Sequence, residues 1–128
     1  MSYALDASTI LAFLFKERGA ETAANAIEDG ALVSSVNLSE VVAKMIDSGA
    51  SDESIRDRIA FLNLEVRDFS QEDAFTAGLL RRQTRVHGLS FGDRACLALA
   101  QSLDLPVLTA DWSWRAVELP GLQVHVIR

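Results

Sequence analysis

Short apolar runs alternate along the chain with longer segments of helical periodicity. The first apolar run, Tyr3–Leu5, stops at Asp6. The second, Ala31–Ser34, precedes a segment in which apolar residues recur at three- and four-residue spacing. This alternation is typical of an α/β domain built on a mainly parallel sheet. We therefore predict such a sheet, with four to five strands and helices between them.

The same patterns place the individual strands and helices. The predicted strands are Tyr3–Leu5, Ala31–Ser34, Leu64–Arg67, Pro106–Thr109 and Leu122–Ile127. The predicted helices are Ser8–Phe15, Ala20–Ile27, a segment capped by Ser35 or Asn37 that ends at Gly49, a segment opened by Ser51, and Ser90–Leu103. A capping box at residues 70–73 predicts one further helix, running through Leu80 toward Arg85.

Composition narrows the class of protein. The chain has 128 residues, of which 49% are hydrophobic, and we predict one domain over residues 1–128. The single cysteine, Cys96, lies among apolar residues, so we interpret it as a core residue rather than a reactive thiol or a zinc ligand. The amino end lacks a basic leader, and no run approaches the ~18 apolar residues that span a bilayer. We expect a cytoplasmic protein without a membrane segment.

Four acidic residues lie where parallel strands end or helices begin. Asp6 follows the first strand, Asp111 follows the fourth, Glu40 lies early in the helix after the second strand, and Asp93 lies near the start of the Ser90 helix. Ligands bind at the carboxyl ends of such strands. Each acid alone is explained as a turn former, a helix cap or a solvated helix residue. Together they predict one shared acidic pocket.

Four carboxylates in one pocket repel one another. Two unit charges 4 Å apart interact by about 4 kcal/mol at an effective dielectric constant near 20. The cluster therefore requires bound protons or a divalent cation. Oxygen ligands favour Mg²⁺ or Mn²⁺ over zinc or copper. His87 and His125 are predicted to lie away from this pocket, which also argues against a zinc enzyme.

Four short motifs resemble those of a known family. They are Leu5-Asp6-Ala7-Ser8, Ser39-Glu40, Gly92-Asp93-Arg94, and Thr109-Ala110-Asp111 with Trp114. In this order, over nearly the whole chain, they resemble a PIN domain, and more narrowly the VapC-type toxins of bacterial and archaeal toxin–antitoxin pairs. The last motif is the most specific of the four.

The resemblance implies a three-layer α/β/α fold and a metal-dependent endoribonuclease, the toxin of a type II toxin–antitoxin system. It implies that the four acids, Asp6, Glu40, Asp93 and Asp111, are catalytic and bind Mg²⁺ or Mn²⁺, with Asp6 and Asp93 as the first candidates for direct ligands. Ser8 and Thr109 would orient the acids or a water. A homodimer and a VapB-like antitoxin that reaches into the site are also implied.

One position departs from the pattern of some family members, which carry a further acid near the last motif. Here Trp112 and Ser113 follow Asp111. A second metal ion, if bound, would therefore be held loosely. The predicted reaction is hydrolysis of an RNA phosphodiester by a water that the metal activates, which requires no histidine base.

The net charge of −6 is unfavourable for binding RNA. A basic strip offers a partial answer, with Arg82, Arg85 and Arg94 as its proposed RNA-binding residues. Nearby positive or potentially positive groups are Arg81, His87 and Arg115. The arginines near the end of this helix could instead only interact favourably with the negative end of the helix dipole. Trp114 is predicted to be a core residue, whereas Trp112 is a candidate for stacking on a base.

Two other function classes share features with this sequence. A phosphotransfer domain of the haloacid-dehalogenase or receiver type also has an acid after its first strand. The phosphatase pattern requires a second aspartate where this chain has Ser8, and both types require a lysine near the site after a late strand. The only lysines, Lys16 and Lys44, occur early, at helical positions. The remaining alternative is a catalytically degenerate PIN-like module that binds a protein or RNA partner.

Overall fold

The computed structural model describes residues 2–128 and contains one five-stranded sheet in the order β3-β2-β1-β4-β5. The strands are β1 (Tyr3–Leu5), β2 (Ala31–Ser34), β3 (Glu65–Arg67), β4 (Val107–Thr109) and β5 (Val124–Val126). All four neighbouring pairs are parallel. The chain builds outward from β1 to β3, crosses back, and then adds β4 and β5 on the other side. The strand order therefore reverses between β1 and β4, the position where open α/β sheets bind ligands.

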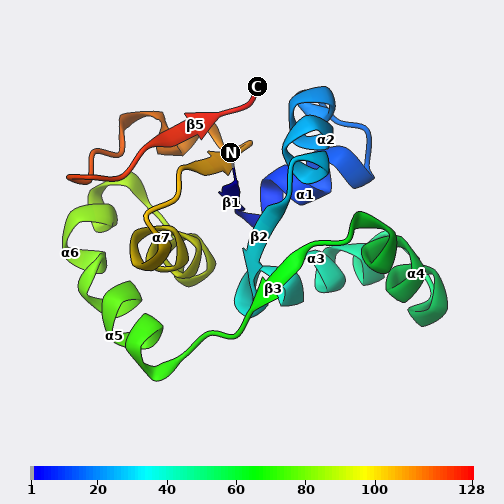
Figure 1. Cartoon of the computed structure of the whole chain (residues 1–128), viewed down its shortest axis with the longest axis horizontal. Coiled ribbons are helices and arrows are strands. Elements are labelled where there is room, and N and C mark those ends of the chain that lie inside the picture. Colours follow the sequence, from blue (N-terminus) through cyan, green and yellow to red (C-terminus); the bar gives the residue numbers. More distant parts are fainter. Residues whose placement is uncertain (1) are drawn as a thin grey trace.

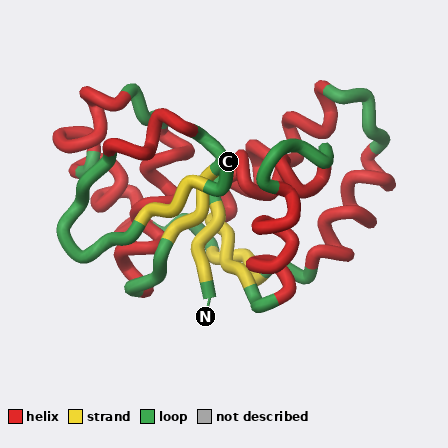
Figure 2. Tube along the Cα trace, turned by 90° about the horizontal axis from the view of Figure 1, so that it is seen from above, coloured by secondary structure: helices red, strands yellow, loops and turns green. Residues whose placement is uncertain are grey.

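Helices cover both faces of the sheet, as Figures 1 and 2 show. One layer contains α1 (Ala7–Leu14), α2 (Ala20–Glu28), α3 (Ser35–Asp47) and α4 (Asp52–Leu62). The other contains α5 (Gln71–Leu79), α6 (Arg81–Thr84) and α7 (Phe91–Leu103), with the 3₁₀ turns η1 (Arg85–His87) and η2 (Trp112–Ala116). The predicted three-layer α/β/α fold is confirmed. Within residues 2–128, no helix is both long and apolar enough to cross a membrane.

Successive strand residues divide between two cores because side chains alternate across a sheet. Ala4 of β1 faces the core under α7, and Leu5 faces the core under α1 and α3. Cys96 and Trp114 both belong to the α7 core and have no exposed surface. Both residues were predicted to be core residues, and their burial confirms it.

Two local predictions were wrong. The cap of α3 is Ser34, whose hydroxyl accepts from the Val36 amide at 3.2 Å, rather than Ser35 or Asn37. The helix predicted to run from Ser70 toward Arg85 is divided into α5, α6 and η1. The hydroxyl of Thr84 donates to the carbonyl of Leu80 at 2.9 Å, and such back-bonding bends helices.

Replacing Trp114 with alanine should lower the free energy of unfolding by about 3–5 kcal/mol, because the substitution leaves a large cavity in a close-packed core. Replacing Trp112, which is 51% exposed, should cost about 1 kcal/mol or less. Urea denaturation of both variants measures the difference. Equal losses would contradict the assignment of Trp114 to the core.

Candidate active site

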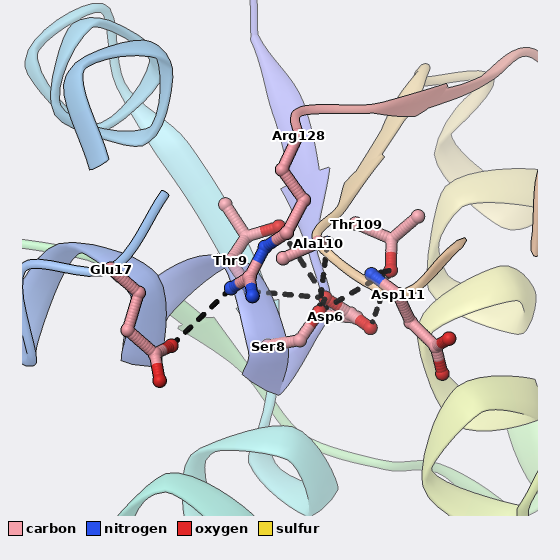
Figure 3. Close-up of polar contacts among 8 residues, drawn as sticks. All are labelled: Asp6, Ser8, Thr9, Glu17, Thr109, Ala110, Asp111 and Arg128. Atoms are coloured by element: carbon pink, nitrogen blue, oxygen red, sulfur yellow. Dashed lines mark hydrogen bonds and ion pairs between the residues drawn. The ribbon is translucent and has the colours of Figure 1, made fainter. Parts of the chain in front are cut away.

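Asp6 is a buried carboxylate at the carboxyl end of β1, with 3% of its surface exposed. Its carboxylate accepts hydrogen bonds from the Ser8 hydroxyl at 2.7 Å, the Thr109 hydroxyl at 3.0 Å and the Thr9 amide at 3.2 Å. Figure 3 shows these groups converging on Asp6 from α1 and from the end of β4. Asp6 therefore caps α1 and also joins β1 to β4 where the strand order reverses.

Burial raises the pKa of Asp6 from 3.8 to about 6. The hydrogen bonds from Ser8, Thr109 and Thr9 oppose this rise because they stabilise the ionised form, and the negative charge of Asp93 adds to it. Asp6 is thus a carboxyl group that releases its proton near pH 6, and a nearby cation would shift this release to lower pH.

Ser8 and Thr109 connect Asp6 to the segment that carries Asp111. The Ser8 hydroxyl donates to Asp6 and accepts from the Ala110 amide at 2.9 Å. The Thr109 hydroxyl donates to Asp6 and accepts from the Asp111 amide at 3.1 Å. Both hydroxyls, taken from the family resemblance as orienting groups, contact the acid and the backbone beside the next acid (Figure 3).

Asp111 and Asp93 each form a cap at the start of a helical segment. Asp111 Oδ1 accepts from the Ser113 amide at 2.9 Å at the start of η2. Asp93 Oδ2 accepts from the Ser90 amide at 2.9 Å, and the Ser90 hydroxyl accepts from the Asp93 amide at 3.2 Å, forming a capping box on α7. Partial burial raises the pKa of Asp93, and the charge of Asp111 adds to the rise.

Glu40 lies on α3, and its side chain points toward α7, which belongs to the helical layer on the other face of the sheet. The Asn37 side-chain amide donates to Glu40 Oε1 at 2.8 Å and to the Gly92 carbonyl at 2.9 Å. A Cβ atom on Gly92 would overlap the Glu40 carboxylate. The glycine therefore permits the close approach of the Glu40 carboxylate to α7 beside Asp93.

The four predicted acids line one pocket of about 350 Å³, although they come from four separate segments of the chain. The other lining residues are Ala7, Ser8, Leu11, Ala43, Lys44 and Asp47. Neither His87 nor His125 is among them.

Lys44 and Asp47 were not predicted to belong to this pocket. They follow Glu40 by four and seven residues on α3, and this spacing places them on the same helix face. The helical spacing from Glu40 could therefore have predicted that both residues line the pocket. The lysine argument against a phosphotransfer domain is unchanged. One lysine does line the acidic pocket, but it lies on α3 rather than after a late strand.

The carboxylate oxygens and the negative charge of the pocket suit a divalent cation that prefers oxygen ligands. Glu40, Asp93 and Asp111 each use one carboxylate oxygen in the hydrogen bonds above, which leaves the second oxygen for a ligand. Mutual repulsion contributes to the raised pKa values of Asp6 and Asp93, and a cation would relieve it. Across residues 2–128, no three His, Cys, Asp or Glu side chains already form a metal-binding group. Binding would therefore draw the carboxylates together.

The proposed RNA-binding arginines do not line the acidic pocket. Arg82 and Arg85 line a different cavity together with Arg81, on α5, α6 and η1. Arg94 is half-buried, and its Nη1 donates to the Ala77 carbonyl at 3.0 Å, which fastens α7 to α5. Arg115 stacks on the exposed ring of Trp112 at 5.0 Å. Three arginines of the predicted basic strip, Arg81, Arg82 and Arg85, therefore share one cavity outside the acidic pocket.

The raised pKa of Asp6 predicts how stability depends on pH without a divalent cation. Below pH 3.8 the carboxyl is protonated in both the folded and the unfolded state. Between pH 3.8 and about 6 only the unfolded state releases the proton, so the folded state loses stability as the pH rises. The full loss, complete above pH 6, is on the order of 3 kcal/mol.

Comparing Asp6→Asn with the wild-type protein by urea denaturation in EDTA isolates this loss. The variant should gain stability relative to the wild type as the pH rises from 4 to 7. The matched control is Asp29→Asn, because Asp29 is exposed, and it should follow the wild type throughout. A stability difference between Asp6→Asn and the wild type that does not change with pH would contradict this account.

Comparison with known proteins agrees with the fold and the motifs. The family model described as "PIN domain" matches residues 3–119. No curated protein gives a significant match to the sequence.

Several solved structures share the fold. A chain of VapBC2 from Rickettsia felis, bound to a DNA fragment from its promoter, has a TM-score of 0.75 at 20% identity, with 100% of both chains covered. A chain of DNA-bound VapBC from Salmonella typhimurium has a TM-score of 0.74 at 21% identity, covering 100% of this chain and 99% of that one. A chain of VapBC-5 from Mycobacterium tuberculosis has a TM-score of 0.65 at 20% identity, with 98% of both covered. On the family match, the chain belongs to the PIN domain family.

Proposed function

We propose that the protein is a metal-dependent endoribonuclease that hydrolyses RNA phosphodiester bonds, the toxin component of a type II toxin–antitoxin system. The observation that carries the proposal is the convergence of four carboxylates on one pocket at the reversal of strand order. Membership of the PIN family supports a nuclease, and the fold shared with chains of VapBC complexes supports the toxin assignment.

Asp6, Glu40, Asp93 and Asp111 are the proposed ligands of Mg²⁺ or Mn²⁺. A bound divalent cation would lower the pKa of a water and offset the negative charge that an RNA phosphate meets. A bound cation would stabilise the ionised form of Asp6, because metal ligands must be deprotonated. Ser8 and Thr109 keep the Asp6 carboxylate directed between β1 and β4, so its orientation is set before any ligand arrives.

Partners follow from the same assignment. The solved VapBC complexes support a VapB-like antitoxin as the protein partner. A homodimer as the working form is proposed on the family resemblance alone. The proposed RNA substrate and antitoxin partner support a cytoplasmic location. The alternative is a degenerate PIN module that only binds a partner, and the intact set of acids disfavours it.

The direct test is incubation of purified protein with a mixed RNA pool in Mg²⁺ or in EDTA, with the products mapped. Cleavage should require the metal and should fall at least 100-fold in Asp93→Asn, since a proposed ligand is removed. The matched control is Asp73→Asn, because Asp73 forms the same capping box with Ser70 on α5 outside the acidic pocket. The control should keep wild-type activity.

Two outcomes would refute the proposed chemistry. One is cleavage that persists in EDTA. The other is an Asp93→Asn protein that remains folded and fully active. A wild-type protein that cleaves nothing and shows no Mn²⁺-dependent change in melting temperature would favour the degenerate module instead.

Measurements of RNA affinity should identify which basic side chains contact the substrate. Measured in an Asp93→Asn background, Lys44→Ala and the double variant Arg82→Ala/Arg85→Ala should each weaken binding. Each should also reduce the salt slope by about 0.7 per lost phosphate contact. Lys16→Ala is the control, because Lys16 lines a pocket away from the acids. An unchanged salt slope in the double arginine variant would remove those arginines from the RNA surface.

A further inference from the structure

A buried amide joins the two helices that carry Glu40 and Asp93. Asn37 lies on α3 with 1% of its surface exposed. Its Nδ2 atom donates to Glu40 Oε1 at 2.8 Å on the same helix and to the Gly92 carbonyl at 2.9 Å on α7. Gly92 directly precedes Asp93 in the sequence. One side chain therefore contacts a proposed ligand and the backbone beside another.

The orientation of this amide follows from its partners. A carboxylate oxygen and a carbonyl oxygen both accept hydrogen bonds, so only the nitrogen of Asn37 can face them. Its Oδ1 atom is then buried without a hydrogen-bond partner in the described part of the chain. A buried polar group left unpaired destabilises the folded state. Asn37 therefore combines two donated hydrogen bonds with one unfavourable unpaired oxygen.

Gly92 completes the arrangement. A side chain at this position would overlap the Glu40 carboxylate, so the absence of one lets Glu40 lie against the first turn of α7. Asn37 then holds Glu40 Oε1 and the Gly92 carbonyl at fixed distances from one nitrogen atom. Glu40 and the start of α7 are linked although they are far apart in sequence.

We infer that Asn37 is a positioning residue for the cation-binding pocket. It holds the Glu40 carboxylate and the start of α7 in the one arrangement in which Glu40 and Asp93 face the same ligand. The inference rests on the proposed function. Hydrogen-bond partners that orient metal ligands commonly contribute 10- to 100-fold to metal affinity or activity.

Asn37→Ala tests the inference through metal affinity. The Mn²⁺ concentration for half-maximal thermal stabilisation, and that for half-maximal RNA cleavage, should each rise about 10-fold or more. The KM for RNA at saturating Mn²⁺ should stay within about 2-fold of the wild type, because Asn37 does not line the pocket. Asn37→Asp keeps the shape of the side chain but lacks its N–H donor. This variant should lose as much Mn²⁺ affinity as Asn37→Ala.

Thr84→Val is the control for a purely structural role. Thr84 is fully buried, and its hydroxyl donates to the Leu80 carbonyl at 2.9 Å, away from the acids. The variant removes a buried hydrogen bond and should keep wild-type Mn²⁺ dependence even where its melting temperature falls. A merely structural Asn37 would behave like Thr84, losing melting temperature and keeping metal affinity.

Gly92→Ala provides a second test that leaves Asn37 intact. Alanine has a higher helix propensity than glycine, so the variant should fold. Its Cβ atom would displace the Glu40 carboxylate. The variant should raise the required Mn²⁺ concentration as Asn37→Ala does. If Asn37→Ala and Gly92→Ala both fold and both keep the wild-type Mn²⁺ dependence, the inference about Asn37 is overturned and the proposed function is not. A wild-type protein that binds no Mn²⁺ would overturn the proposed function and this inference with it.

Discussion

The hydrogen bond between the Thr109 hydroxyl and the buried carboxylate of Asp6 is the contact on which the rest of the site depends. It fixes the carboxyl ends of β1 and β4 where the strand order reverses, and it fixes a charged group where water is largely excluded. Burial of that group is unfavourable, as its raised pKa shows. The neighbouring hydroxyl of Ser8 and the amide of Thr9 offset part of the cost. They also leave Asp6 oriented toward the segment that carries Asp111 (Figure 3).

Each acid of the pocket also serves the local fold. Asp6 caps α1, Asp93 closes a capping box on α7, and Asp111 caps η2. Glu40 is held by the amide of Asn37. Helix capping and a cation site are therefore compatible explanations for the same side chains. The caps hold like charges near one another by local hydrogen bonds, and the proposed cation would compensate the repulsion that remains.

Sequence patterns were sufficient for the sheet, the layers and the convergence of the acids, because strand ends in a parallel sheet share one edge. They were insufficient where the outcome depended on how helices are rotated or joined. Lys44 lines the pocket through the orientation of α3, and Arg82 lines a different cavity, on α6, where the predicted single helix is divided. The bond from Asn37 to Gly92 spans 55 residues, and no local pattern predicts such a pairing.

The central claim is that carboxylates from four segments share one divalent cation. Anomalous scattering from a crystal soaked in Mn²⁺ tests it without reference to any RNA. The account predicts a Mn²⁺ peak in the pocket, with oxygen atoms of Asp6 and Asp93 at about 2.0–2.3 Å, near the distances of octahedral cations. A saturated crystal with no peak there, or with Mn²⁺ bound only elsewhere, would contradict it.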